Sequence, residues 1–126
     1  MFDNLALFRL SAAQAAHAVQ RLSVTAANVA NADTPGFRAQ TVDGFADMLD
    51  RGGTLALRVT RAGHMVPAGG TGPARIRDAG GQAAPNGNTV SLEREMIAGV
   101  EAGQEQARAL AIYRHGLTVL RLSLGR

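Results

Sequence analysis

The sequence predicts a mainly α-helical protein in which a long helix at each end of the chain pairs with the other in an antiparallel arrangement. Apolar residues recur with helical spacing at both ends of the chain. Nine of the 15 glycines and three of the four prolines lie between residues 51 and 90. The glycine-rich middle is therefore expected to be partly β or irregular. With 126 residues, the chain has the length of about one small domain.

Three zones follow from this pattern. Residues 1–34 form the predicted N-terminal helix, residues 35–90 form a turn, a short strand and a glycine-rich insert, and residues 91–126 form the C-terminal helix. Charge is distributed unevenly, with a formal −2 on residues 1–50, +4 on residues 51–90 and +1 on the C-terminal zone. The small net charge of +3 permits an anionic partner without requiring one.

The N-terminal helix is predicted from eight apolar residues that step alternately by three and four positions, which is a heptad spacing. This seam consists of Leu5, Phe8, Ala12, Ala15, Val19, Leu22, Ala26 and Val29. An acceptor side chain at Asp3 or Asn4 is expected to cap the start of the helix. Pro35 and Gly36 are expected to end it, because proline cannot continue the hydrogen bonds and glycine readily adopts a positive φ.

The middle zone contains two candidate strands. Leu55, Leu57 and Val59 alternate with small or polar residues, which is typical of a strand. Residues 75–77 are a second, shorter candidate. The runs of glycine at 69–72 and 80–81 are interpreted as connectors, since a phosphate-binding loop would need a lysine and a following helix.

The C-terminal helix is predicted to begin after Ser91, a favourable N-cap residue, with Glu93 and Glu95 where the helix dipole favours negative charge. Its apolar stripe runs to residue 124 with one stutter. The stripe consists of Met96, Val100, Gly103, Ala107, Leu110, Tyr113, Leu117, Leu120 and Leu124. Small residues in both seams would let another helix approach closely, although an ordinary two-helix core explains the pattern as well.

Two helices bury little apolar surface by themselves, and small domains are marginally stable even when well packed. Leu5 and Leu124 still follow the seams near the two ends of the chain. We therefore expect helix packing between molecules to complete the core, which predicts a subunit of an assembly.

The residues that usually carry chemistry are sparse. The absence of cysteine excludes disulfides, thiolate metal sites and cysteine nucleophiles. His17 and His115 have no histidine or carboxylate one helical turn away, and His64 has no neighbouring acid. Glu93 and Glu95 point to different helix faces. No catalytic, metal or cofactor-binding residue is predicted.

A nucleic-acid-binding module is an alternative, because five arginines concentrate charge in the middle zone. They are Arg51, Arg58, Arg61, Arg75 and Arg77. No binding motif accompanies them and aromatic residues make up only 4% of the chain, so a solvated surface is the favoured interpretation.

No stretch approaches the roughly 18 apolar residues of a membrane-spanning helix. Residues 1–18 do not fit a secretory signal, because Asp3 replaces the positive segment and Arg9 interrupts the apolar run. By general secretion rules the chain is expected in the cytoplasm. The absence of cysteine is equally compatible with an oxidising compartment reached by another route, so the compartment stays open at this point.

Residues 22–38 read LSVTAANVANADTPGFR. This segment resembles the N-terminal signature of bacterial flagellar rod and hook proteins, carried here by Asn28, Asn31, Thr34, Pro35, Gly36 and Phe37. Residues 87–96 read GNTVSLEREM and, with Leu57, Thr60 and His64, are similar to the proximal rod subunits of that family. Within that second motif the signature residues are Asn88, Leu92, Glu93 and Met96.

The resemblance implies an antiparallel coiled-coil-like domain of terminal helices that assembles into a tubular core and helps to transmit torque. The implied location is the periplasmic rod of the basal body, reached without a cleavable signal peptide. The implied partners are other copies of the chain, the rod subunits FlgC and FlgF, the adaptor FliE, the membrane-ring protein and, in transit, the flagellar export apparatus. It implies no cofactor, nucleic acid or direct lipid contact. The alternatives are another axial subunit such as FlgC or a non-flagellar helical adaptor.

Overall fold

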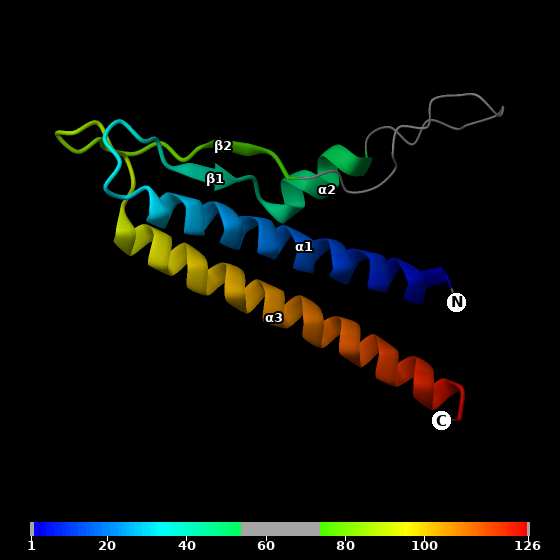
Figure 1. The fold of residues 1–126 in the computed structure, drawn as a ribbon. Coiled ribbons are helices and arrows are strands. Elements are labelled where there is room, and N and C mark those ends of the chain that lie inside the picture. Colours follow the sequence, from blue (N-terminus) through cyan, green and yellow to red (C-terminus); the bar gives the residue numbers. More distant parts are fainter. Residues whose placement is uncertain (1, 54–73, 126) are drawn as a thin grey trace.

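The structure, a computed structural model, describes residues 2–53 and 74–125 (Figure 1). Two long helices, α1 (Phe2–Ala30) and α3 (Leu92–Ser123), lie side by side and run in opposite directions (Figure 1). The predicted fold class is thereby confirmed. On the side of α1 away from α3 lie a two-stranded sheet and the short helix α2 (Phe45–Gly53).

The sheet is small and antiparallel. Strand β1 (Gln40–Val42) pairs with β2 (Ile76–Asp78), with Thr41 opposite Arg77. β2 confirms the second candidate strand of the sequence, whereas β1 and α2 were not predicted. The candidate strand at Leu55–Val59 lies outside the described residues.

A compact apolar cluster holds the sheet and α2 against α1. Val24 of α1, Val42 of β1, Met48 of α2 and Ala74 are buried together, and Phe45 packs against them. Because β1 and α2 each place one apolar face on α1, the cluster gives these short elements the tertiary support that they lack in isolation.

The ends of the long helices differ in part from the expectations. α1 already begins at Phe2, so Asp3 and Asn4 lie inside its first turn and do not precede it as caps. α1 ends at Ala30, ahead of Pro35, and the positive φ expected for Gly36 is confirmed at 72°. Ser91 occupies the N-cap position of α3, but its side chain makes no capping hydrogen bond.

The two long helices approach each other through small side chains. Four residues of α3 that are spaced by seven positions are buried, and all but Glu95 are small: Glu95, Ala102, Ala109 and Gly116. A Cβ atom added at Gly116 would lie 3.0 Å from two ring atoms of Phe8 on α1. The Phe8 ring also meets Tyr113 edge to face, with 5.1 Å between ring centroids. Close packing of this kind depends on the missing side chain at Gly116.

Candidate assembly site

The end of α1 and the start of α3 are joined by four polar side chains, which we call the polar lock (Asn28, Asn31, Asn88 and Thr89). Asn28, Asn88 and Thr89 are buried, and Asn31 is half-buried. Asn88, only 4% exposed, stands at its centre. Its Nδ2 lies 2.9 Å from the carbonyl oxygen of Asn31 and 2.8 Å from those of Ala32 and Thr34. Its Oδ1 accepts a hydrogen bond from the N–H of Val90 at 2.7 Å. One side chain thus satisfies the turn after α1 and the segment that leads into α3.

Asn28 performs a second bridging role, at the edge of the sheet. Its side chain is 1% exposed and bonds both backbone groups of Gln40, donating to the oxygen at 2.7 Å and accepting from the nitrogen at 2.9 Å. Ala39 and Asp43 direct their backbone bonds to the β2 side, so those of Gln40 point the other way. The Asn28 amide therefore pairs with β1 as a neighbouring strand would.

The remaining members of the lock hold the turn itself. Asn31 Nδ2 donates to the oxygen of Ala27 at 2.8 Å, and Thr34 Oγ1 donates to Asn31 Oδ1 at 3.2 Å. The hydroxyl of Thr89 accepts a hydrogen bond from the N–H of Ala39 at 2.8 Å. The backbone N–H of Thr89 donates to the carbonyl oxygen of Phe37 at 3.1 Å. Residues separated by about fifty positions are thereby tied into one hydrogen-bonded network.

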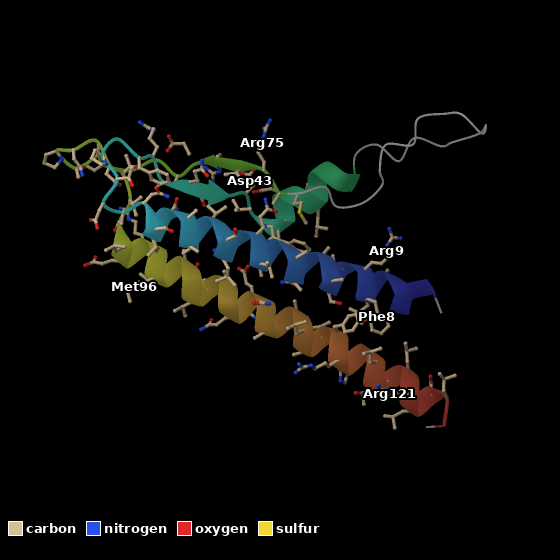
Figure 2. The ribbon with its side chains drawn as sticks, in the orientation of Figure 1. Phe8, Arg9, Asp43, Arg75, Met96 and Arg121 are labelled. Carbon is tan, nitrogen blue, oxygen red and sulfur yellow. The ribbon has the colours of Figure 1, made fainter. Side chains whose placement is uncertain are left out.

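The signature residues therefore divide into two groups. One group takes part in the hydrogen-bonded network around the turn. It consists of the three asparagines, Thr34, Gly36 and the backbone of Phe37. Pro35 is exposed beside it. Leu92, Glu93 and Met96 instead lie exposed on α3, and Figure 2 shows Met96 on the side of α3 that faces away from α1.

The buried line between the helices runs beside the predicted seam residues. On α1, three seam residues are half-buried and four are exposed; the half-buried ones are Phe8, Ala15 and Leu22, and the exposed ones are Ala12, Val19, Ala26 and Val29. On α3 the half-buried ones are Gly103, Leu117 and Leu120, and the exposed ones are Val100, Ala107, Leu110 and Leu124. Nothing is described for the side chain of Leu5. Ala102 and Ala109 occupy the contact on α3, because small side chains permit the closest approach.

The outward face of α3 is correspondingly apolar near the start of the helix. Met96 is 71%, Ile97 61% and Val100 62% exposed. With Glu101 and Gln104 these residues line a shallow groove of about 280 Å³. Further along the helix the exposed cations Arg108, Arg114 and Arg121 make no ion pair with any of the described residues. A helix face of this kind is typical of a protein–protein contact.

Among the described residues, Arg21 forms two ion pairs across the helix interface. Arg21 of α1 bonds Glu105 of α3 at 2.7 Å and lies 3.5 Å from Glu101. The Arg21–Glu105 pair is partly shielded from solvent, so it orients the two helices as well as attracting them.

On the sheet, the carboxyl group of Asp78 accepts a hydrogen bond from Arg38 and a second one from the N–H of Gly80. These bonds lower the pKa of Asp78 below its ordinary value.

The two histidines that the structure describes lie in different environments. His17 is buried, its Nε2 lies 2.8 Å from the carbonyl oxygen of Asp43, and its ring lies against Phe45. Since a carbonyl can only accept, Nε2 carries the proton. His115 is exposed, and His64 lies outside the described residues. Within residues 2–53 and 74–125, no three metal-ligating side chains gather at one point, and no helix is long and apolar enough to cross a membrane.

Comparison of the sequence with known proteins identifies a family. Residues 6–38, which span most of α1 and the turn held by the lock, match the family model described as flagella basal body rod protein. The chain is 34% identical over 114 residues to the flagellar basal body rod protein FlgB of Salmonella typhimurium, covering 80% of this chain and 75% of that protein. The chain belongs to the FlgB family of flagellar basal body rod proteins. It is a structural subunit of the proximal rod.

Other FlgB proteins match over a shorter length. Identity is 37% over 90 residues to FlgB of Yersinia ruckeri and 39% over 89 residues to FlgB of Escherichia coli K12. Each of these alignments covers 60% of this chain and 62% of the relative. These matches favour FlgB over the alternative of another axial subunit such as FlgC.

Sequence reasoning missed several contributors to the FlgB-family site. Thr89 and Asn86 belong to the network around the turn, and Arg21 crosses the helix interface. The run Pro85-Asn86-Gly87 is a turn sequence and offered a local signal for that part of the network. Nothing local points to the partners of Arg21, because they lie about eighty residues away along the chain.

Proposed function

We propose that this rod subunit joins its neighbours through the outward face of α3 and carries torque through the stiffness of the α1–α3 pair. The exposure of Met96, Ile97 and Val100 supports this proposal, since burying a side chain of this size is worth roughly 1.5–3 kcal/mol. The exposed members of the predicted seam, Val100 among them, are proposed to pack against the helices of a neighbouring subunit.

The proposed neighbours are other copies of the chain, the rod subunits FlgC and FlgF, the adaptor FliE and the membrane-ring protein. The export apparatus is a proposed contact in transit, and the proposed location is the periplasmic part of the rod. The role is structural and not catalytic. The polar lock supports such a role, because its hydrogen bonds join the end of α1 to the segment that leads into α3.

The test is the double variant Met96→Glu with Val100→Glu, introduced into a strain that lacks this chain. Two carboxylates in the shallow groove oppose burial against a neighbour but leave the α1–α3 contact intact. We expect wild-type helix content by circular dichroism in the purified variant, loss of swimming, and absence of rods from isolated basal bodies.

The matched control is Ile76→Glu, which places one carboxylate on an exposed apolar residue of β2, away from α3. This variant is expected to swim and to assemble rods. Normal rods in the double variant would contradict the proposed surface. An equal loss in the Ile76 variant would show that the effect is not specific to α3.

Two seam residues that are half-buried provide a second test. Leu117→Asp or Leu120→Asp is expected to abolish incorporation by weakening the helix pair itself. These variants should also lose helix content before assembly, which separates them from the surface variants. Normal motility with either substitution would argue against a mechanical role of the helix pair.

A further inference from the structure

The segment that faces the turn after α1 is a tight hairpin turn. The N–H of Gly87 donates to the carbonyl oxygen of Ala84 at 2.8 Å, and the N–H of Ala84 donates to the oxygen of Asn88 at 2.8 Å. Pro85 takes the second position of the turn, and Gly87 has a φ of 81°. These features describe a three-residue hairpin loop that ends in a left-handed glycine.

The same segment contains a chemically reactive pair. Of the five asparagines in the chain, Asn86 alone is followed by glycine. The backbone nitrogen of the next residue can attack the side-chain carbonyl carbon of an asparagine. The nitrogen loses its proton, the C–N bond of the side-chain amide breaks, and ammonia leaves. Glycine favours this reaction because it has no side chain to obstruct the attack and adopts the required backbone angles at little cost.

The product of this attack is a five-membered cyclic imide. Water then opens either of its two carbonyl groups, which yields aspartate or isoaspartate. The balance is one water consumed and one ammonia released, with no change in oxidation state.

We propose that Asn86 is a site of spontaneous deamidation that the folded turn protects. The attacking nitrogen of Gly87 has its hydrogen engaged by Ala84, and Asn86 Oδ1 accepts the N–H of Asn88 at 3.0 Å. Both reacting groups are thus held by other partners. The side chain of Asn86 is exposed, so burial plays no part in this protection.

Modification at this position would disrupt the polar lock. The backbone oxygen of Asn86 accepts the N–H of Gly36 at 2.9 Å, and its side chain fixes Asn88. A Cβ added at Gly87 would lie 3.4 Å from the Cα of Gly36, so the two segments are in close contact. Isoaspartate routes the backbone through the former side chain, which displaces this carbonyl. A chain modified while unfolded is therefore expected to refold poorly.

The first comparison is between the purified chain in native buffer and the same chain in concentrated urea at mildly alkaline pH. Deamidation is followed by mass spectrometry of the peptides that together contain all five asparagines, including the one that spans residues 84–90. In urea, Asn86 is expected to react faster than the other four asparagines. In native buffer the reaction at Asn86 is expected to slow by about tenfold or more, because the reacting atoms are held out of the attack geometry.

Two further measurements complete the test. Chains aged in urea and then diluted into buffer should regain less helix by circular dichroism, and the deficit should follow the fraction of isoaspartate. An Asn86→Ser chain, which cannot form the imide, should show no such deficit after the same ageing. Equal rates at Asn86 in buffer and in urea would overturn the proposed protection. Faster reaction at Asn88 than at Asn86 in urea would overturn the proposed site. Each measurement is made on the isolated chain, so its outcome is independent of the assembly proposal.

Discussion

The two ends of the α1–α3 pair are held by different forces. At the end that carries the polar lock, buried amides make short, directional hydrogen bonds, with Asn88 alone bridging three carbonyl oxygens. At the other end the contact consists of the Phe8 ring against Tyr113 and Gly116, with no polar pairing across this part of the described interface. One end specifies geometry through hydrogen bonds, and the other provides close apolar packing.

This difference indicates that the two ends of the helix pair have different structural roles. A network of satisfied amides tolerates few arrangements, because each unpaired group would carry a desolvation cost. Packing through Gly116 and Phe8 tolerates small adjustments of ring position. The lock is thus suited to setting the angle between the helices, while the surfaces left exposed along α3 remain available to neighbours.

The largest loss of stability is expected from a substitution at Asn88, the centre of the polar lock. Asn88→Asp replaces the donating NH₂ group by a carboxylate oxygen that faces three carbonyl oxygens in a buried site. The free energy of unfolding, measured by urea denaturation, should fall by about 3 kcal/mol or the chain should fail to fold.

The matched control for this variant is Asn31→Asp, which changes an amide at the better-solvated side of the lock. Its two hydrogen bonds, one donated to the oxygen of Ala27 and one accepted from Thr34 Oγ1, lie at the surface, so the loss of stability should be clearly smaller. Equal losses in the two variants would indicate that Asn88 holds no special place in the lock.

A smaller effect is expected at the apolar end of the pair. Gly116→Leu forces the Phe8 ring to move, and the free energy of unfolding should fall by about 2 kcal/mol. Gly103→Leu on the same helix is the control, because a Cβ there meets no atom within 4 Å. That substitution should raise stability by about 0.8 kcal/mol through helix propensity. If both variants behave alike in thermal unfolding, the close approach at Gly116 does not contribute to stability.

The ion pair between the two ends should contribute less. Glu105→Gln removes one charge from a partly shielded pair, and the free energy of unfolding should fall by about 1 kcal/mol, less in high salt. Glu101→Gln, at the longer and more exposed contact, should change it little. The comparison is made by urea denaturation at low and high salt, and a loss independent of salt would point to packing instead of charge.

The smallest effect is expected at the sheet. Because the pKa of Asp78 is lowered in the folded chain, the ionised carboxylate contributes to the free energy of unfolding at pH values above the pKa of about 4 that Asp78 has in the unfolded chain. This contribution should disappear as the pH falls through the pKa that Asp78 has in the folded chain, since Asp78 is then protonated in both the folded and the unfolded chain. Thermal unfolding of Asp78→Asn against the unaltered chain should show a small difference at pH 7 and none in strong acid. A difference that persists in strong acid would assign it to another cause.

Much of the fold is predictable because it rests on local patterns. The spacing of apolar residues indicates both long helices, and Pro35 with Gly36 indicates where the first one stops. The segment up to Phe37 carries the family resemblance. Helix α2 escaped prediction because its nine residues depend on burying Phe45 and Met48 against α1, and a helix this short is not stable by itself.

The sequence alone determined the two long helices, the turn that follows the first of them and the family, because periodicity, turn residues and motifs are properties of neighbouring positions. Only the tertiary structure decided which helix face is buried. Heptad spacing leaves the phase of contact open, and close approach at Ala102, Ala109 and Gly116 selected the line of small residues. The tertiary structure also decided the role of Asn88, since the three carbonyl oxygens that its Nδ2 meets lie more than fifty residues away and become neighbours only when the chain folds.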